Sequence, residues 1–151
     1  MPSALRTVTT TALCALSAAS LIATASPAQA EFAGVCTVEY PDPNVPTRVE
    51  SSKVSANVTA PGTVTFQFET HSTTDQPYTQ TATVIWANID TGRNGSTATE
   101  ARINAGSTTL TLPPTETKPG TLAIVAQVHN VADDGQHVST LDCSAEYTVT
   151  S

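Results

Sequence analysis

The segment LDCSAEYTV, residues 141–149, alternates apolar and polar side chains along its whole length. Side chains of a β-strand point to opposite faces in turn, so every second residue lies on the same face. The apolar face then holds Leu141, Cys143, Ala145, Tyr147 and Val149. This pattern predicts a half-buried strand whose apolar face, Cys143 included, packs against a core.

Five further segments repeat this two-residue period and predict strands of the same kind. Their apolar faces are Cys36, Val38 and Tyr40; Val54, Ala56 and Val58; Val64, Phe66 and Phe68; Thr108, Leu110 and Leu112; and Leu122, Ile124, Ala126 and Val128. Residues 97–103 form a weaker candidate, with Glu100 and Arg102 on the exposed face. Residues 82–89, ATVIWANI, are apolar on both faces, which predicts a central, well-covered strand anchored in the core by Trp86.

Turn signals separate these segments at intervals of about ten residues. They are Pro41, Pro43 and Pro46, followed by the pairs Pro61-Gly62, Asn94-Gly95, Ala105-Gly106, Pro113-Pro114, Pro119-Gly120 and Asp134-Gly135. No segment keeps the apolar period of 3.6 residues that is typical of an amphipathic helix. The sequence therefore predicts one all-β domain, residues 31–151, folded as an antiparallel β-sandwich of about seven or eight strands.

Residues 1–30 have the pattern of a secretory signal peptide. Arg6 precedes an apolar segment at residues 11–25, and the small residues Ala28 and Ala30 follow it. A membrane-spanning helix needs about 20 apolar residues, whereas this segment is shorter and is broken by Thr and Ser. We therefore expect cleavage after Ala30 and a secreted, extracellular product without a membrane span.

The chain after residue 30 keeps five Lys and Arg residues against thirteen Asp and Glu, a formal charge of −8. Such an acidic chain has no basic stripe to neutralise phosphates, so neither nucleic acid nor an anionic membrane surface is an expected partner. We expect a partner from the extracellular medium or the cell envelope, and a chain that is a monomer or a weak oligomer.

Cleavage would remove Cys14 and leave Cys36 and Cys143, an even pair in an exported chain. Disulfides persist in oxidising compartments, and both cysteines fall on the apolar faces of their strands. A metal or redox pair is the alternative, but no Cys-x-x-Cys spacing supports it. We expect a Cys36–Cys143 disulfide that joins the first strand to the last.

The strand number, Trp86 in a central strand and a cysteine on each side of it resemble a small secreted bacterial immunoglobulin-like β-sandwich. The resemblance covers most of residues 31–151 and concerns the architecture. In antibody-type domains the disulfide bridges the second and sixth strands, whereas Cys36 and Cys143 lie on the first and the last. The resemblance implies two antiparallel sheets packed face to face.

The tripeptide Asp90-Thr91-Gly92 resembles the catalytic motif of aspartic proteases, in which two carboxylates share a proton. That family usually has Ser or Ala after the glycine, and Arg93 stands there in this chain. The alternative is a hairpin turn in which Gly92 and Asn94-Gly95 adopt a positive φ. We expect a turn whose Asp90, Arg93 and Asn94 are available for contacts, with weak calcium binding by residues 90–96 as a further alternative.

A second candidate site is the segment HNVADDGQH, residues 129–137. Its two histidines and two carboxylates, His129, Asp133, Asp134 and His137, are donors that zinc or copper accepts in proteins. Asp134-Gly135 is also an ordinary hairpin-turn signal. The segment therefore predicts either a metal site or a solvated polar turn.

The leading hypothesis for function is a non-enzymatic module, without a cofactor, that binds an unknown partner or has a structural role. Binding residues of such modules lie mainly on loops, and the loops expected here are residues 41–47, 90–96 and 130–138. An enzyme, either an aspartic protease or a metal-dependent one, is the third and least favoured class.

The second hypothesis is a small-ligand carrier. Trp86 and Asp90-Thr91-Gly92 are similar to residues of the actinomycete enediyne-chromoprotein apoproteins, which are small, acidic, exported sandwiches. That resemblance implies a ligand cleft lined by Phe66, Phe68 or Trp86. A fully packed interior would argue against it.

Overall fold

The computed structural model describes residues 31–151, and every regular element in that range is a β-strand. The strands are β1 (Ala33–Pro41), β2 (Val49–Ala60), β3 (Thr63–Ser72), β4 (Tyr78–Asn88), β5 (Asn94–Ile103), β6 (Gly106–Thr111), β7 (Thr115–Glu116), β8 (Gly120–Ala132) and β9 (His137–Val149). The all-β prediction is confirmed. The predicted signal peptide, residues 1–30, lies outside the described residues.

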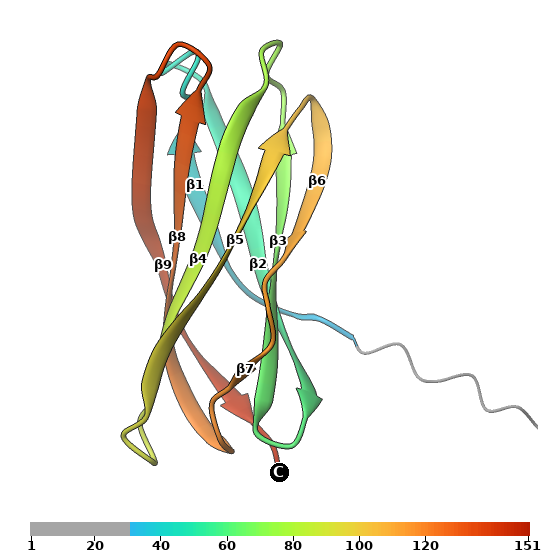
Figure 1. Cartoon of the computed structure of the whole chain (residues 1–151), viewed down its shortest axis with the longest axis vertical. Helices are drawn as coiled ribbons and strands as arrows, with labels where there is room; N and C mark the ends of the chain where they lie inside the picture. The colour runs from blue at the N-terminus through green and yellow to red at the C-terminus, as the bar shows by residue number, and fades with distance from the viewer. Residues whose placement is uncertain (1–30) are drawn as a thin grey trace, which may run out of the picture.

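The strands form two antiparallel sheets that pack face to face (Figure 1). In the first sheet the order is β1-β2-β3-β6, and the short β7 pairs with β3 beyond the end of β6. In the second sheet the order is β5-β4-β8-β9. The chain crosses between the sheets after β3, after β5 and after β7. Residues 104–105 therefore join the β5 and β6 edges on one side of the sandwich.

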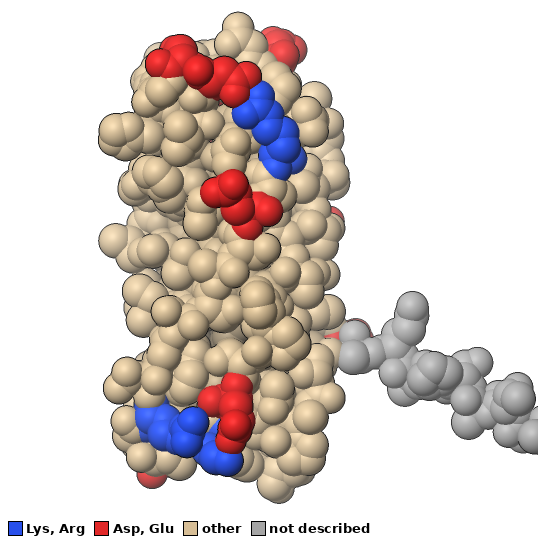
Figure 2. All heavy atoms as spheres, in the orientation of Figure 1, with Lys and Arg blue, Asp and Glu red and all other residues tan. Residues whose placement is uncertain are grey.

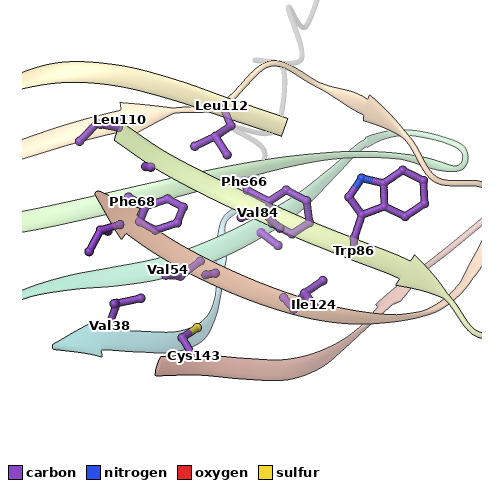
Figure 3. Packing of buried hydrophobic residues seen from close by; sticks show 14 of the residues in the cluster. Val38, Val54, Phe66, Phe68, Val84, Trp86, Leu110, Leu112, Ile124 and Cys143 are labelled. Carbon is purple, nitrogen blue, oxygen red and sulfur yellow. The ribbon is translucent and has the colours of Figure 1, made fainter. Parts of the chain in front are cut away.

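The core fills the space between the two sheets, as Figure 3 shows for residues from both. The inward side chains are those that the two-residue period predicts on β1, β2, β3, β6 and β8. Trp86 is 4% exposed and belongs to this cluster, so its role as a core anchor is confirmed. Burial of these apolar surfaces supplies most of the free energy that holds the sheets together.

The prediction for Leu141 is wrong, because this side chain is 65% exposed. The pairing of β8 with β9 shifts between Ala126 and Val128, so one extra residue of β9 is accommodated there as a β-bulge. Before the bulge Thr140 is half-buried, and after it Cys143 is buried. The bulge therefore reverses which residues of β9 face the core. The predicted pattern, in which the odd-numbered residues face inward, holds only from Cys143 onwards.

Two expectations around β4 are also wrong. The strand is central but covered on one face, since the side chain of Ile85 is 45% exposed. Asn94-Gly95 is no turn, because β5 begins at Asn94 and the positive φ of the hairpin, 73°, belongs to Gly92. Gly95 pairs with Trp86, and a Cβ at Gly95 would lie 2.8 Å from Cζ2 of the indole. Glycine is required at position 95 because the indole occupies the space of a side chain.

A buried hydrogen-bond network joins the two sheets near one end of the core. Gln80 of β4 accepts a bond from the Thr70 hydroxyl at 2.6 Å and donates one to the Tyr40 hydroxyl at 2.9 Å. The Ser52 hydroxyl lies 2.7 Å from that of Thr70, and the Tyr78 hydroxyl lies 3.3 Å from that of Tyr40. Burial raises the pKa of Tyr78 well above its ordinary value of 10.0. Buried polar groups satisfied in this way specify one packing of the sheets.

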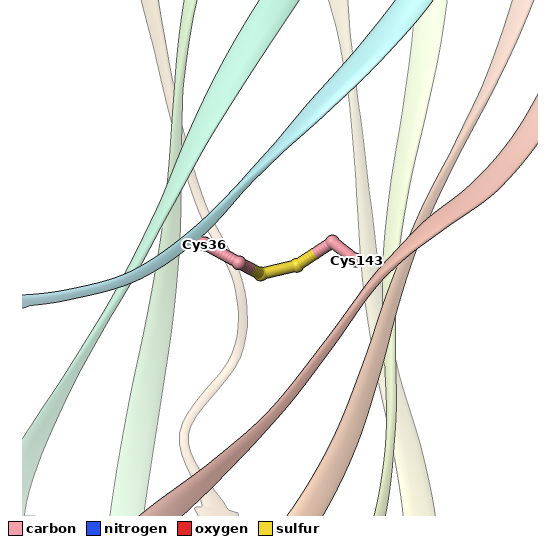
Figure 4. The surroundings of a disulfide bond; sticks show 2 residues. All are labelled: Cys36 and Cys143. Atoms are coloured by element: carbon pink, nitrogen blue, oxygen red, sulfur yellow. A yellow bond between two sulfur atoms is a disulfide. The ribbon is translucent and has the colours of Figure 1, made fainter.

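The Cys36–Cys143 disulfide is present, which confirms the predicted pairing (Figure 4). It joins β1 to β9, the edge strands that lie on the same side of the two sheets. The two Cα atoms are 5.9 Å apart, and the cysteines are 107 positions apart in the chain. Among residues 31–151 no chain connection crosses between the sheets on this side, so the disulfide closes it.

Replacing both cysteines, in a Cys36→Ala/Cys143→Ala variant, should lower the free energy of unfolding by about 4–5 kcal/mol, the chain-entropy value for a loop of this length. Urea unfolding of the oxidised wild type and the variant gives the difference, and the reduced wild type is the control. A loss of unfolding free energy below about 1 kcal/mol would show that the packing of β1 against β9 does not depend on the disulfide.

The raised pKa of Tyr78 predicts a pH effect on stability. The folded state keeps this phenol protonated while the unfolded chain ionises above its ordinary pKa of about 10, so stability falls as pH rises beyond 10. One such phenol contributes a slope of at most about 1.4 kcal/mol per pH unit. Urea unfolding between pH 8 and pH 11 should give a shallower decline for Tyr78→Phe than for wild type. Identical slopes would contradict the assignment.

Candidate functional site

The predicted loops do not form one surface. Residues 41–47 and 130–138 lie at the end of the sandwich that is uppermost in Figure 1, together with the β3–β4 connection. Residues 90–96 lie at the opposite, lower end with the β2–β3 turn. A single partner therefore contacts either the upper loops or the lower loop, unless it spans the length of the sheets.

The upper loops are braced against one another. The side-chain amide of Asn44 donates to the carbonyl oxygen of Gln76 at 2.8 Å, and Arg48 donates to the carbonyl oxygen of Thr73 at 2.9 Å. Asp42 is fully buried, and its carboxylate accepts the Asn44 N–H at 2.7 Å and lies 3.6 Å from the Arg48 guanidinium. The Pro-rich loop is thus a rigid part of the fold.

A second buried carboxylate, Glu50, supports the same end and was not singled out from the sequence. Glu50 is 3% exposed and accepts the N–H of Thr73 with both oxygens at 3.1 Å. The Thr73 hydroxyl donates a third bond to it at 3.1 Å. Buried charges require such partners, so this carboxylate has a structural role.

The two histidines of the predicted metal site lie on the outer face of the second sheet. The rings of His129 and His137 have centroids 5.9 Å apart and are tilted by 44° to each other, and Nδ1 of His129 lies 2.7 Å from the Ser139 hydroxyl. Both rings are exposed. The β8–β9 pairing therefore does bring the histidines together.

The two carboxylates of that site have other partners. Asp133 forms an ion pair with Arg102 of β5, which lowers the pKa of the Asp133 carboxyl and raises that of the guanidinium. Asp134 accepts the N–H of Gln136 at 2.9 Å and so stabilises the turn. Within residues 31–151 no three His, Cys, Asp or Glu side chains are placed to hold a metal ion. The metal site stays a prediction from the sequence.

Asn88 organises the lower end, a role that no pattern in the sequence indicated. It is 1% exposed, and its amide nitrogen donates to the carbonyl oxygens of residues 117–119 at 3.0–3.2 Å. Its side-chain oxygen accepts the N–H groups of Asp90 and Thr91 at 3.0 Å each. One side chain thus links the β4–β5 turn to the segment before β8.

Asp90 takes part in the same arrangement. Its carboxylate accepts the N–H of Thr121 at 2.7 Å, and the N–H of Gly92 closes the turn on the carbonyl oxygen of Asn88 at 2.8 Å. Arg93 and Asn94 remain exposed beside it. This geometry favours the turn interpretation of Asp90-Thr91-Gly92, because the carboxylate already holds the start of β8.

The lower end also carries an exposed ion pair between Glu116 and Lys118. The hydrogen bond from Lys118, its charge and the more distant charge of Arg93 lower the pKa of Glu116. Exposed pairs of this kind contribute little to stability and are screened by salt.

Sequence reasoning missed an exposed apolar surface on the outer face of the second sheet. Ile85 and Ala87 of β4 are exposed, and Ala123 and Val125 of β8 are half-buried beside them. With Asn94 and Ser96 of β5 they line an open hollow of about 580 Å³. We call these six residues the apolar band. In the sequence, the β4 part of the apolar band belongs to residues 82–89, which are apolar on both faces. That pattern predicted a strand buried on both faces.

Charged side chains flank this surface. Figure 2 shows them gathered towards the two ends of the molecule, with a wide uncharged stretch between them. Glu100, Arg102 and Asp133 belong to the upper part of the second sheet, and Arg93 and Lys118 to the lower part. Along the strands the apolar band therefore lies between two groups of charges, and across the sheet Glu146 of β9 lies beside Ala123.

No family model, no curated protein and no solved structure matches this chain. Among residues 31–151 no helix has the length and apolar character that crossing a membrane would require.

The Asn88 arrangement predicts a large effect of one substitution. Asn88→Ala should lower the free energy of unfolding by about 2–3 kcal/mol, because buried backbone groups of the turn and of residues 117–119 lose their partners. The matched control is Asn94→Ala, an exposed residue of the same hairpin, which should change stability by less than about 0.5 kcal/mol. Equal midpoints for both variants in urea unfolding would refute the role of Asn88.

Proposed function

We propose that this chain is a secreted, non-enzymatic recognition module with an immunoglobulin-like fold, and that it contacts a protein partner through the apolar band. The observation that carries the proposal is the exposure of Ile85 in an uncharged hollow on a sheet face. An antiparallel sheet with one face in water normally alternates apolar and polar residues, whereas the outer face is apolar here at Ile85 and Ala87 of β4 and at Ala123 and Val125 of β8.

The arrangement of charges supports the same proposal. Cores of protein interfaces are depleted in charged residues, and their rims are polar and accessible to water. The apolar band is uncharged, and the charged groups, among them Glu100 and Arg93, stand above and below it.

Secretion and the immunoglobulin-like assignment rest on other observations. A disulfide between the edge strands suits an oxidising compartment, and residues 1–30 have the pattern of a bacterial export signal. Two antiparallel sheets with three crossing connections are the architecture that the immunoglobulin-like resemblance implies. The partner is then a component of the medium or the cell envelope.

The enzyme hypotheses have less support. Asp90 is engaged by the N–H of Thr121, and Asp133 by Arg102, so neither carboxylate stands free beside a second catalytic group. Both contacts have a structural explanation. We propose no cofactor.

A small-ligand carrier is the second candidate, favoured by the volume of the hollow, about 580 Å³, which lies within the range of ligand pockets. The interior argues against it. Phe66 and Phe68 are fully buried in the core and do not line the hollow. Trp86 does line it, but it is only 4% exposed and packs in the same core. A carrier of this kind would hold its ligand on the outer surface of the sheet.

The proposal predicts that one exposed side chain decides partner capture. The immobilised secreted chain should retain a protein from culture fluid or cell envelope, and Ile85→Glu should abolish retention because a charge would be buried at the contact. The matched control is Val49→Glu, which places the same charge on an apolar residue of β2 that is 66% exposed. If the Ile85→Glu variant still retains the partner, or if both variants lose it equally, the contact does not lie on the apolar band.

A further inference from the structure

The histidines of β8 and β9 are diagonal neighbours on the outer face of the second sheet. The strand pairing places His129 opposite Ser139, and His137 stands two residues before Ser139 on the same face. Both rings are exposed, and their centroids are 5.9 Å apart. Two imidazoles that each bind one metal ion at about 2.1 Å have centroids roughly 5–6 Å apart. The rings are therefore spaced as two ligands of one ion are.

A hydrogen bond prepares the first of these rings for metal binding. Nδ1 of His129 lies 2.7 Å from the Ser139 hydroxyl oxygen, which can accept the proton of that nitrogen. In this tautomer the lone pair belongs to Nε2, an atom with which histidine binds metals. Histidine ligands usually donate their other N–H to an oxygen, which fixes the ring and raises its basicity. Ser139 is therefore a positioning residue.

The turn before β9 holds the second ring. The N–H of Ala132 donates to the carbonyl oxygen of Gln136 at 2.8 Å, and the N–H of Gly135 donates to the carbonyl oxygen of Ala132 at 3.0 Å. The Asp134 carboxylate accepts the N–H of Gln136 at 2.9 Å. β9 begins at His137, directly after this closed turn. The backbone of both histidines is thus fixed by the β8–β9 hairpin, and little ordering is needed when an ion binds.

The charges around the pair favour a cation. Glu100 belongs to the same row of the sheet as His129, two strands away. Asp134 lies in the turn between the two histidine strands. The positive charge of Arg102 is balanced by its ion pair with Asp133. The local charge is therefore negative and attracts a metal ion.

We infer that His129 and His137 form a surface site for one Cu²⁺ ion, with water in the remaining coordination positions. Imidazole suits copper and zinc alike, and a site of nitrogen and oxygen ligands generally binds Cu²⁺ most tightly among divalent first-row metals. Zinc sites in proteins have three or four protein ligands. Within residues 31–151 no third His, Cys, Asp or Glu side chain completes this pair. Tetragonal copper accepts two imidazoles together with water.

The copper site is separate from the apolar band. His129 lies four residues along β8 from Val125, on the same outer face. Metal binding at the two histidines needs no apolar contact, so this inference goes beyond the proposed function and does not rest on it. The ion is a bound ligand with open coordination positions, to which a donor group of another molecule can add, and it takes no part in a reaction.

Pulsed electron paramagnetic resonance of the oxidised secreted chain with one equivalent of Cu²⁺ counts the imidazoles on the ion. Wild type should show two, and His129→Gln and His137→Gln should each show fewer. Equilibrium dialysis against Cu²⁺ should give about a hundredfold weaker binding for either variant, because the second point of attachment is lost. All these changes are at exposed residues, so the urea midpoints should match that of wild type.

The third histidine of the chain provides a matched control. His71 of β3 lies on the other sheet, with the Ser107 hydroxyl 3.4 Å from its Nδ1. His71→Gln should therefore bind Cu²⁺ like wild type. The role of Ser139 has its own test: Ser139→Ala should weaken binding about tenfold with two imidazoles still on the ion, and Ser139→Thr, which keeps the hydroxyl, should restore it.

The remaining outcomes are equally decisive. A copper spectrum that is the same in His129→Gln as in wild type, or equal losses of affinity in His71→Gln and His137→Gln, would overturn the site. Tighter binding of Zn²⁺ than of Cu²⁺ in competition dialysis would overturn the choice of metal. Ile85→Glu should bind copper like wild type, and a loss there would overturn the separation from the apolar band. A chain that binds copper at the histidines but retains no protein supports this inference and contradicts the proposed function.

Discussion

The Cys36–Cys143 bond is the constraint on which the rest of the structure depends. Two sheets that face each other need connections on both sides, and in residues 31–151 the chain crosses at the β5–β6 side and at the two ends. The β1 and β9 edges are joined by sulfur instead. With that side closed, the inward faces of both sheets exclude water over their whole width, and the buried network around Gln80 can form between them.

The loops on which binding was first expected are largely committed to the fold. At the upper end Asp42 and Arg48 fix the Pro-rich loop, and at the lower end Asn88 fixes the turn that contains Asp90. The surface left without such partners is the outer face of β4 and β8, where Ile85 is exposed. This division explains why we place recognition on a sheet face, between two groups of charges, and not on a loop.

Much of the fold could be predicted because alternation reports directly on which face of a strand is buried. It succeeded wherever a strand pairs regularly, as with Phe66 and Phe68. It failed at Leu141, because a bulge changes the parity of a strand without leaving a mark in its own sequence. It failed at Gly95, because a glycine is equally typical of a turn and of a position where a neighbouring side chain leaves no room for a Cβ. At position 95 the reason is the indole of Trp86.

The candidate site was less predictable, since it depends on which strands become neighbours. The sequence by itself determined an all-β chain, most of its inward side chains and the pairing of Cys36 with Cys143. The side-chain period can be read from neighbouring residues, and residues 31–151 contain two cysteines. Only the tertiary structure decided that β4 is covered on one face, that Asn88 holds the lower end, and that Ile85 and Val125 share one surface. These features arise from strand order and register, which pair residues far apart in the chain and are set by the packing of the whole sandwich.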